Sequence, residues 1–385
     1  MNSGRVANAG TARRPNIVLI VTDDQRADTL WAMPNVRKYL SRPGIKFRNG
    51  YVTNSVCCPS RATILTGNYS HTTGVYQNAG RHGGFRSFDD SSTIATSVGN
   101  AGYRTGLFGK YLNQYVKPRY VPPGWDQWHA FIDYDPAVRY YDFHLSDNGT
   151  EHAYPRLFGN YATDVLKRKA LNFIKNSNRP FFLYFAPHAP HELRNSETAV
   201  PAPRHRGAYE NVQLQPSPSY DEEDVSDKPA WVQALPRMTG LNNHQGTLES
   251  LLAVDEAVAE MVAALREDGE LKNTMIIFTS DNGASWGEHR WVEKQDPYRG
   301  SAKVPFIVRY DRLIDRSAPR EELVTNLDLA PTFGDAANVD PAADVDGASF
   351  LPLLRTRSAD WRSDFLVEHL EKKGIPSYCG VRSVE

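Results

Sequence analysis

Four polar residues at two separate places in the sequence could together bind a cation. Asp23 and Asp24 follow the apolar run NIVLIVT, and Asp281 and Asn282 follow the run NTMIIFTS. If the two runs are neighbouring strands, three carboxylates and an amide oxygen meet, and their negative charge requires a cation. Oxygen ligands without histidine or thiolate suit a hard ion, Ca²⁺ or Mg²⁺, rather than zinc. The residue types therefore predict a metal site.

A second reactive segment is CCPSRATILTG, which begins at Cys57. Pro59 is typical of the first turn of a helix, and Gly67 is typical of a helix end. Cys57 or Cys58 would then lie at a helix N-terminus, where the helix dipole and Arg61 favour an anion. The residue types leave two interpretations, a thiolate nucleophile of low pKa or a buried structural cysteine.

Further reactive side chains follow two other apolar runs. Lys110 comes directly after TGLFG, and His188 and His191 come after FFLYFAP. In a parallel sheet the carboxyl ends of the strands lie along one edge, and ligands bind there. We therefore expect these three side chains to lie beside the acidic groups.

The elements that must position these groups alternate along the chain. Four apolar runs lack polar alternation, which is typical of parallel strands buried on both faces. They occupy residues 16–24, 105–113, 180–191 and 273–283. Helical patterns precede the last three runs, at residues 91–102, 162–176 and 248–268. This alternation predicts an α/β fold with a large, mostly parallel sheet flanked by helices.

The same segments resemble a known family. Cys57-Cys58-Pro59-Ser60-Arg61 followed by ATILTG resembles the Cys-x-Pro-Ser-Arg signature of type I sulfatases. PNIVLIVTDDQ is similar to the first strand of that family, and SDNG and GEHRWVEKQDPYRGSAKVPFIV are similar to its later metal and lysine segments. GASFLPLL resembles the segment that closes the main domain. The double cysteine, GKYLNQY, PPGW and APH look most like the N-acetylglucosamine-6-sulfatase branch.

The resemblance implies an alkaline-phosphatase-like α/β sandwich, with a catalytic domain over residues 15–355. Residues 1–14 are expected to be a disordered tail. Residues 356–385 are expected to begin a small C-terminal antiparallel subdomain, which the pattern predicts to be truncated at the last residue. Residues 195–245 are rich in proline and polar residues. They are predicted to be a surface excursion near the substrate entrance or a disordered insert.

The resemblance also implies the metal centre and a modification. Cys57 would be oxidised to formylglycine after translation, by a formylglycine-generating enzyme or an equivalent. One Ca²⁺ ion is expected, with Mg²⁺ as the alternative. Its ligands would be Asp23, Asp24, the modified Cys57, Asp281 and Asn282.

The remaining implied roles concern the substrate. Arg61 would hold the hydrate of formylglycine, whose hydroxyl attacks sulfur. Lys110, His191 and Lys294 would contact the sulfate and the bridging oxygen, and His191 or Lys294 would protonate the leaving oxygen. His191 is preferred to His188 because it matches the last histidine of the family motif. His289 is expected to bind substrate near the pocket.

The expected function is hydrolysis of sulfate monoesters of sulfated sugars, of the 6-O-sulfated N-acetylglucosamine type. A sulfated carbohydrate or a small aryl sulfate would be the substrate. Two alternative enzymes are a broad arylsulfatase and a phosphate or phosphonate monoester hydrolase of the same superfold. A third alternative is an inactive protein that binds sulfated glycans.

The composition narrows the class of partner. The chain has 44 Lys and Arg residues against 45 Asp and Glu, a net charge of −1, which provides no basic surface for nucleic acid. No apolar run reaches the roughly 18 residues that a membrane span needs. The N-terminal sequence MNSGRVANAGTARRPN lacks the apolar core of a signal peptide. The expected location is therefore the cytoplasm, unless the N-terminus is incomplete.

Overall fold

The computed structural model describes residues 13–134, 140–193, 198–213, 216–240, 244–339, 345–356, 360–372 and 374–383. Within this part of the chain, ten strands form one twisted sheet in the order β12-β2-β11-β8-β1-β7-β3-β4-β5-β6. Two further pairs of strands, β9 with β10 and β13 with β14, form small antiparallel sheets. Of the predicted N-terminal tail, residues 1–12 lie outside the described residues.

The strands are β1 (Asn16–Thr22), β2 (Ile45–Tyr51), β3 (Arg104–Gly109), β4 (Gln127–Phe131), β5 (Phe143–Asp147), β6 (Thr150–Tyr154), β7 (Phe181–Ala186), β8 (Thr274–Ser280), β9 (Ser285–Trp286), β10 (Val292–Glu293), β11 (Ile307–Arg309), β12 (Arg320–Thr325), β13 (Asp364–His369) and β14 (Tyr378–Ser383). The α-helices are α1 (Pro34–Val36), α2 (Cys57–Thr66), α3 (Ser70–Thr73), α4 (Ile94–Asn100), α5 (Ala162–Lys175), α6 (Ala230–Gln233), α7 (Gln245–Glu267), α8 (Arg299–Ala302), α9 (Leu329–Ala337) and α10 (Leu351–Arg355).

The four predicted strands are β1, β3, β7 and β8, and they are neighbours at the centre of the sheet. β1 pairs in parallel with β7 on one side and with β8 on the other, and β3 pairs in parallel with β7. Their carboxyl ends therefore lie along one edge of the sheet. The three predicted helices are α4, α5 and α7.

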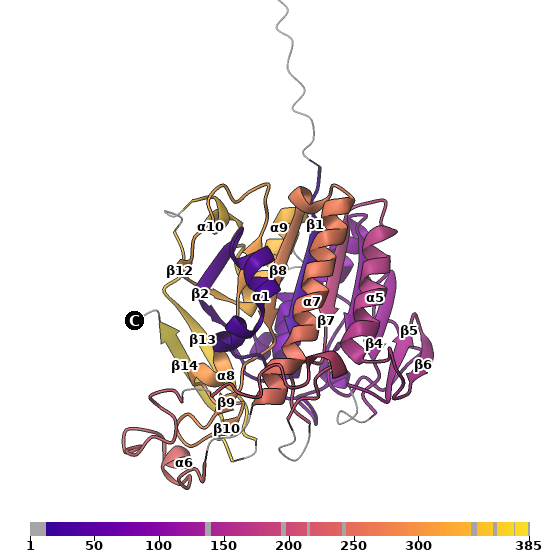
Figure 1. Cartoon of the computed structure of the whole chain (residues 1–385). Helices are drawn as coiled ribbons and strands as arrows, with labels where there is room; N and C mark the ends of the chain where they lie inside the picture. Colours follow the sequence, from indigo (N-terminus) through magenta and orange to yellow (C-terminus); the bar gives the residue numbers. More distant parts are fainter. Residues whose placement is uncertain are drawn as a thin grey trace, which may run out of the picture.

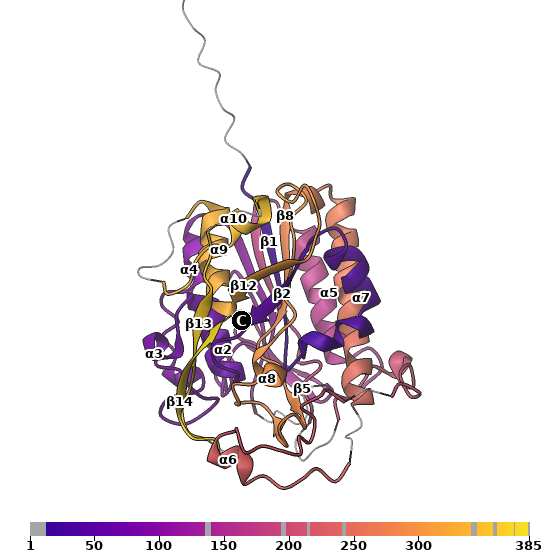
Figure 2. The same ribbon diagram turned by 90° about the vertical axis from the view of Figure 1, so that its left-hand side faces the viewer.

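Both faces of the central strands are buried, which explains their continuous apolar runs. Within β1, Ile17, Leu19 and Val21 pack in one core cluster, whereas Val18 and Ile20 pack in another. The second cluster lies under α5 and α7, which cover one face of the sheet (Figure 1). The first lies under α2, α4, α9 and α10 on the opposite face (Figure 2). The fold is thus a three-layer α/β sandwich, as predicted.

The sheet is mixed towards its edges. β11 runs antiparallel to β2 and β8, and β5 runs antiparallel to β4 and β6. The small sheet of β13 and β14 uses the two C-terminal segments predicted as strands, and Phe365 and Val367 of β13 pack against Tyr51 at the end of β2. No helix among the described residues combines the length and apolar character needed to cross a membrane.

The described parts of the predicted excursion at 195–245 lie against the loop that follows β9. The amide of Asp221 donates to the carbonyl of Gly287, and Arg290 donates to the carbonyls of Glu222 and Glu223. The excursion therefore supports a loop that reaches the candidate site described next.

Candidate active site

The acidic residues of two separate strand ends meet because β1 and β8 are parallel and in register. Thr22 is the partner of Ser280, so the residues that follow each strand emerge side by side. The amide of Asp24 donates to Oδ1 of Asp281 over 3.1 Å, and Nδ2 of Asn282 donates to Oδ1 of Asp24 over 2.6 Å. Asp24 has a positive φ of 65°, an uncommon backbone conformation of the kind that concentrates at functional sites.

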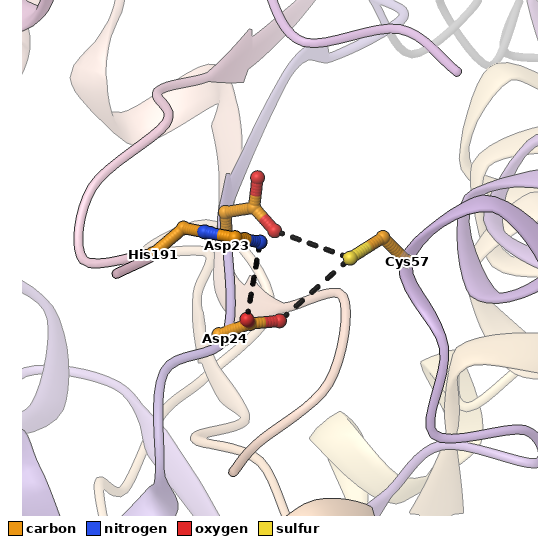
Figure 3. A group of neighbouring side chains, drawn as sticks. All are labelled: Asp23, Asp24, Cys57 and His191. Atoms are coloured by element: carbon orange, nitrogen blue, oxygen red, sulfur yellow. Dashed lines mark hydrogen bonds and ion pairs between the residues drawn. The ribbon is translucent and has the colours of Figure 1, made fainter. Parts of the chain in front are cut away.

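Cys57 reaches the same cluster from the first turn of α2. Its Sγ lies 3.5 Å from Oδ1 of Asp23 and 3.7 Å from Oδ1 of Asp24 (Figure 3). The helix begins at Cys57 and ends before Gly67, which has a φ of 77°, as its sequence predicts. Ligand atoms of Asp23, Asp24, Cys57 and His191 all lie within 4.8 Å of one another (Figure 3).

The environment of the two cysteines disfavours a thiolate nucleophile. The side chain of Cys57 is 0% exposed, and burial raises the pKa of its thiol to about 12. Burial likewise raises the pKa of the Cys58 thiol to about 12, and the backbone amide of Cys58 donates to Oδ1 of Asn78. Both side chains are therefore protonated thiols at neutral pH.

Three cations balance the three carboxylates. Nε of Arg61 donates to Oδ2 of Asp281 over 2.8 Å, and Nζ of Lys110 donates to Oδ2 of Asp23 over 2.6 Å. Nζ of Lys294 lies 2.6 and 2.7 Å from the two oxygens of Asp24 and 2.8 Å from Sγ of Cys57. Lys294 thus joins the cysteine to the acidic cluster.

The pKa values follow from burial and from these charges. Burial raises the pKa of Asp23, but the charges of Lys110 and His191 outweigh it and hold that pKa well below the usual range. Burial and the charge of Asp23 raise the pKa of Asp281 to about 6. Burial lowers the pKa of Lys294, but Asp24 and Cys57 raise it well above its ordinary value. Lys294 therefore remains a cation at neutral pH.

The two histidines that follow β7 lie on the same side of the cluster. Nε2 of His191 lies 3.4 Å from Oδ2 of Asp24, and its Nδ1 lies 2.5 Å from the carbonyl oxygen of Glu192. His188 is buried against Oδ2 of Asp23 at 3.4 Å, and its ring stacks on that of His191. Burial lowers the pKa of His191. His191, unlike His188, is among the residues that line the cavity above the cluster.

The structure does not bring His289 into this cluster. Its Nδ1 lies 2.6 Å from a carboxylate oxygen of Glu222, and its ring packs against Tyr298. Its backbone has a positive φ of 51°. The turn therefore directs His289 towards the excursion, away from the residues that line the cavity.

The site also contains residues that sequence reasoning missed. Arg26 pairs with both carboxylate oxygens of Glu288 at 3.1 and 2.8 Å and lies over the ring of Trp286. The ring of Trp286 also stacks on that of His244, with ring centroids 3.7 Å apart. No motif marks these residues, because they meet only through loops distant in the sequence. His188, by contrast, could be recognised from the sequence, because it belongs to the repeated motif Ala-Pro-His at residues 186–191.

A cavity of about 1230 Å³ opens above the cluster. Its lining includes Asp24, His191, Lys294 and Gln295, together with His244 and Trp286. Several sugar rings could fit in such a volume. The cavity therefore allows a bulky substrate to reach the groups around Cys57.

The donor set suits a metal ion. Asp23, Asp24 and Asp281 supply carboxylate oxygens within one cluster, of which Asp24 lines the cavity. Oδ1 of Asn282 is buried and has no hydrogen-bond partner among the described residues, which leaves one more oxygen to bind a cation. Such oxygen donors fit a hard cation.

The comparisons with known proteins agree with this geometry. A family model described as Sulfatase matches residues 15–339. The chain belongs to the sulfatase family. Human N-acetylglucosamine-6-sulfatase is 35% identical to this sulfatase over 94% of the chain and 68% of the human protein. The extracellular sulfatase SULF-1 homolog of Drosophila melanogaster is also 35% identical over 94% of the chain. The chain spans only 34% of the length of that Drosophila protein.

A solved structure confirms the fold class. The structure of BT4656 in complex with its substrate D-glucosamine-2-N,6-O-disulfate superposes on this sulfatase with a TM-score of 0.82 and 28% identity. The match covers 97% of this chain and 87% of BT4656. The architecture is therefore the alkaline-phosphatase-like fold of the sulfatases.

Proposed function

We propose that this sulfatase hydrolyses sulfate monoesters of saccharides, of the 6-O-sulfated glucosamine type. The observation that carries the proposal is the position of Cys57, which is buried in contact with Asp24 and Lys294, two residues that line the large cavity. It lies between Asp23 and Asp24 and within 2.8 Å of the ammonium of Lys294. In this arrangement residue 57 would supply the attacking group, the carboxylates would bind a cation, and the ammonium would bind the sulfate.

The related proteins support a sugar as the substrate. The human relative is named N-acetylglucosamine-6-sulfatase, and the solved structure of BT4656 holds a disulfated glucosamine. The cavity of about 1230 Å³ is large enough for such a ring. We therefore favour a saccharide over a small aryl sulfate as the natural substrate.

We further propose that Cys57 acts as formylglycine. A buried thiol whose pKa is raised to about 12 is a poor nucleophile at neutral pH, so an unmodified cysteine does not explain the site. The hydrated aldehyde would supply an attacking hydroxyl. Arg61 would fix the charge of Asp281 beside it, because Nε of Arg61 donates to that carboxylate.

Asp23, Asp24, Asp281 and Asn282, with residue 57, would hold one Ca²⁺ ion. The ion would supply positive charge to the sulfate oxygens and lower the pKa of the attacking hydroxyl. Three carboxylates already face three cations here, so a divalent ion would leave the site positive and favourable for an anionic ester. Lys110 and Lys294 would then bind sulfate oxygens, and His191 or Lys294 would protonate the leaving oxygen.

Two measurements test the proposal. Oxidation of the Cys57 thiol to the aldehyde lowers the mass of its peptide by about 18 Da, which mass spectrometry detects in protein from the native host. The modified protein should hydrolyse 4-nitrophenyl sulfate and N-acetylglucosamine-6-sulfate faster than the matching phosphates. A faster phosphate or phosphonate reaction would favour the other hydrolase of this superfold. An unmodified Cys57 in active protein would contradict the formylglycine assignment.

A further inference from the structure

Two buried polar side chains that line the cavity have atoms without a hydrogen-bond partner in the part of the chain that the structure describes. His369, the last residue of β13, is 2% exposed and lines the cavity. Neither of its ring nitrogens has a hydrogen-bond partner among the described residues. Buried polar groups are normally paired, because an unpaired group loses its bonds to water without compensation. A ligand that entered the cavity could supply the missing partner.

The second side chain is Gln295, which directly follows Lys294. It is 5% exposed and lines the same cavity, and its Oε1 has no partner in the described part of the chain. The two residues are connected through Tyr378, whose hydroxyl donates to the carbonyl of Gln295 over 2.8 Å. The ring of Tyr378 stacks on that of His369 with centroids 5.3 Å apart. The side chain of Tyr378 therefore bridges His369 and the segment that carries Lys294.

Lys372 brings a positive charge close to His369. Lys372 also lines the cavity, and its ammonium has no ion-pair partner among the described residues. The neighbouring carboxylate of Glu368 is directed elsewhere, because it accepts from the amide and the ring of His71. Burial and the charge of Lys372 lower the pKa of His369 to about 4. At neutral pH the ring is neutral and retains one N–H to donate.

We propose that His369, Lys372 and Gln295 form a second subsite, which binds another anionic group of the saccharide whose sulfate ester lies at Lys294. The N–H of His369 and the ammonium of Lys372 would donate to the oxygens of a sulfate or carboxylate. Oε1 of Gln295 would accept from a hydroxyl or N–H on the same ring. This inference rests on the proposed function and narrows the substrate to saccharides with at least two anionic groups.

The test compares mono- and disulfated substrates. N-acetylglucosamine-6-sulfate is the reference, and the analogues carry a second sulfate on N2 or O3 of the same ring. The variants are His369→Phe and Lys372→Ala. Lys272→Ala is the matched control, because Lys272 lies two residues before the start of β8, whereas Asp281 follows the other end of that strand. For the unchanged protein we expect a higher kcat/KM on one disulfated analogue than on the reference.

The expected result is a loss of that preference by about tenfold in both variants and by less than twofold in the control. Phenylalanine retains the stacking on Tyr378 and removes the unpaired nitrogens, so His369→Phe should also raise the melting temperature. A purely structural role of His369 predicts the opposite, a lower melting temperature and an unchanged preference. That result, or an unchanged preference in Lys372→Ala, would overturn the subsite.

Calorimetric titration with the same sugars separates this inference from the proposed function. If the protein cleaves none of them but binds the disulfated sugar more tightly, and the variants lose that difference, the subsite stands and the hydrolase assignment fails. If all variants bind both sugars equally while the protein hydrolyses the reference, the hydrolase stands and the subsite fails.

Discussion

Two side chains approach the carboxylate of Asp24 from different elements, and each could protonate the leaving oxygen. His191 arrives from the segment after β7, and Lys294 arrives from the loop after β10. Lys294 has a pKa well above its ordinary value, which opposes proton release, whereas burial lowers the pKa of His191. The two roles therefore differ, and Lys294 is better suited to hold charge.

Replacing His191 with Asn should affect substrates according to their leaving groups. General acid catalysis contributes roughly 10²–10⁴-fold when the leaving oxygen is basic. We expect that loss of kcat on a sugar sulfate and a loss of less than about tenfold on 4-nitrophenyl sulfate, because nitrophenolate departs without a proton. Steady-state kinetics on both substrates measures the difference.

The control for this experiment is His152→Gln on β6, where the side chain is exposed. It should change neither rate. Equal losses on the two substrates in the His191 variant would indicate that His191 positions the ester instead of donating a proton.

The positions of single residues show which parts of the site can be predicted from the sequence and which cannot. Asp23, Lys110 and His191 could be placed together, because each follows a strand and parallel strands share an edge. His289 could not be placed, because a positive φ turns it towards Glu222 and no local pattern encodes that turn. The role of Gln295 could not be predicted either, because its neighbour Tyr378 comes from β14, which is distant in the sequence.

The loop from Glu288 to Gln295, which includes the two residues of β10 and carries Lys294, contains several uncommon backbone conformations. His289, Arg290, Glu293 and Gln295 all have positive φ values. The loop is held at its start by the buried pair of Arg26 and Glu288, with side chains 8% and 9% exposed. This pair therefore positions Lys294 from a distance.

We expect Glu288→Gln to reduce kcat by about tenfold while KM changes little. The substitution keeps the shape of the side chain but leaves the charge of Arg26 less well compensated, which costs roughly 3 kcal/mol or less because Asp28 still pairs with it. Asp28→Asn is the matched control. Its carboxylate is 63% exposed, so its loss should cost below about 1 kcal/mol and spare kcat. Equal kcat values in the two variants would contradict a positioning role.

The last residue of β3, which directly precedes Lys110, must be a glycine. Gly109 has a φ of 121°, and a Cβ there would lie 1.9 Å from the carbonyl oxygen of Ala186. Gly109→Ala should therefore lower the melting temperature, with a backbone cost of about 1–3 kcal/mol, and displace Lys110. Gly74→Ala is a useful comparison, because that glycine also has a positive φ, of 71°, but a Cβ there would have nothing within 4 Å. A smaller effect at Gly109 than at Gly74 would contradict this account.

At the level of elements, the sequence predicts the centre of the sheet better than its edges. The four buried strands have continuous apolar runs and were located from those runs alone. β6 has the sequence TEHAY and is mostly exposed, and β11 has only three residues, so neither carries a periodic signal. Edge strands are identified by their partners, which a single sequence does not reveal.

At the scale of the whole molecule, the candidate metal site combines residues more than 250 positions apart in the sequence. A cation bound at this site should therefore stabilise the entire fold. We expect Ca²⁺ to raise the melting temperature and a chelator to reverse the effect. At a free concentration one hundred times Kd, binding adds about 2.7 kcal/mol. Asp281→Asn, which keeps the side-chain shape, should remove most of the shift. A larger effect of Mg²⁺ than of Ca²⁺ would reassign the ion.

The complete enclosure of Cys57 has a consequence for the order of events in the cell. Its sulfur touches Lys294, a residue synthesised 237 positions later, and no part of the side chain reaches solvent. An enzyme that modifies Cys57 cannot reach its thiol in the folded protein. If residue 57 becomes an aldehyde, the oxidation must be complete before the chain folds and Lys294 packs against the sulfur. Protein that folds before this oxidation would keep an unmodified Cys57 thiol and remain inactive.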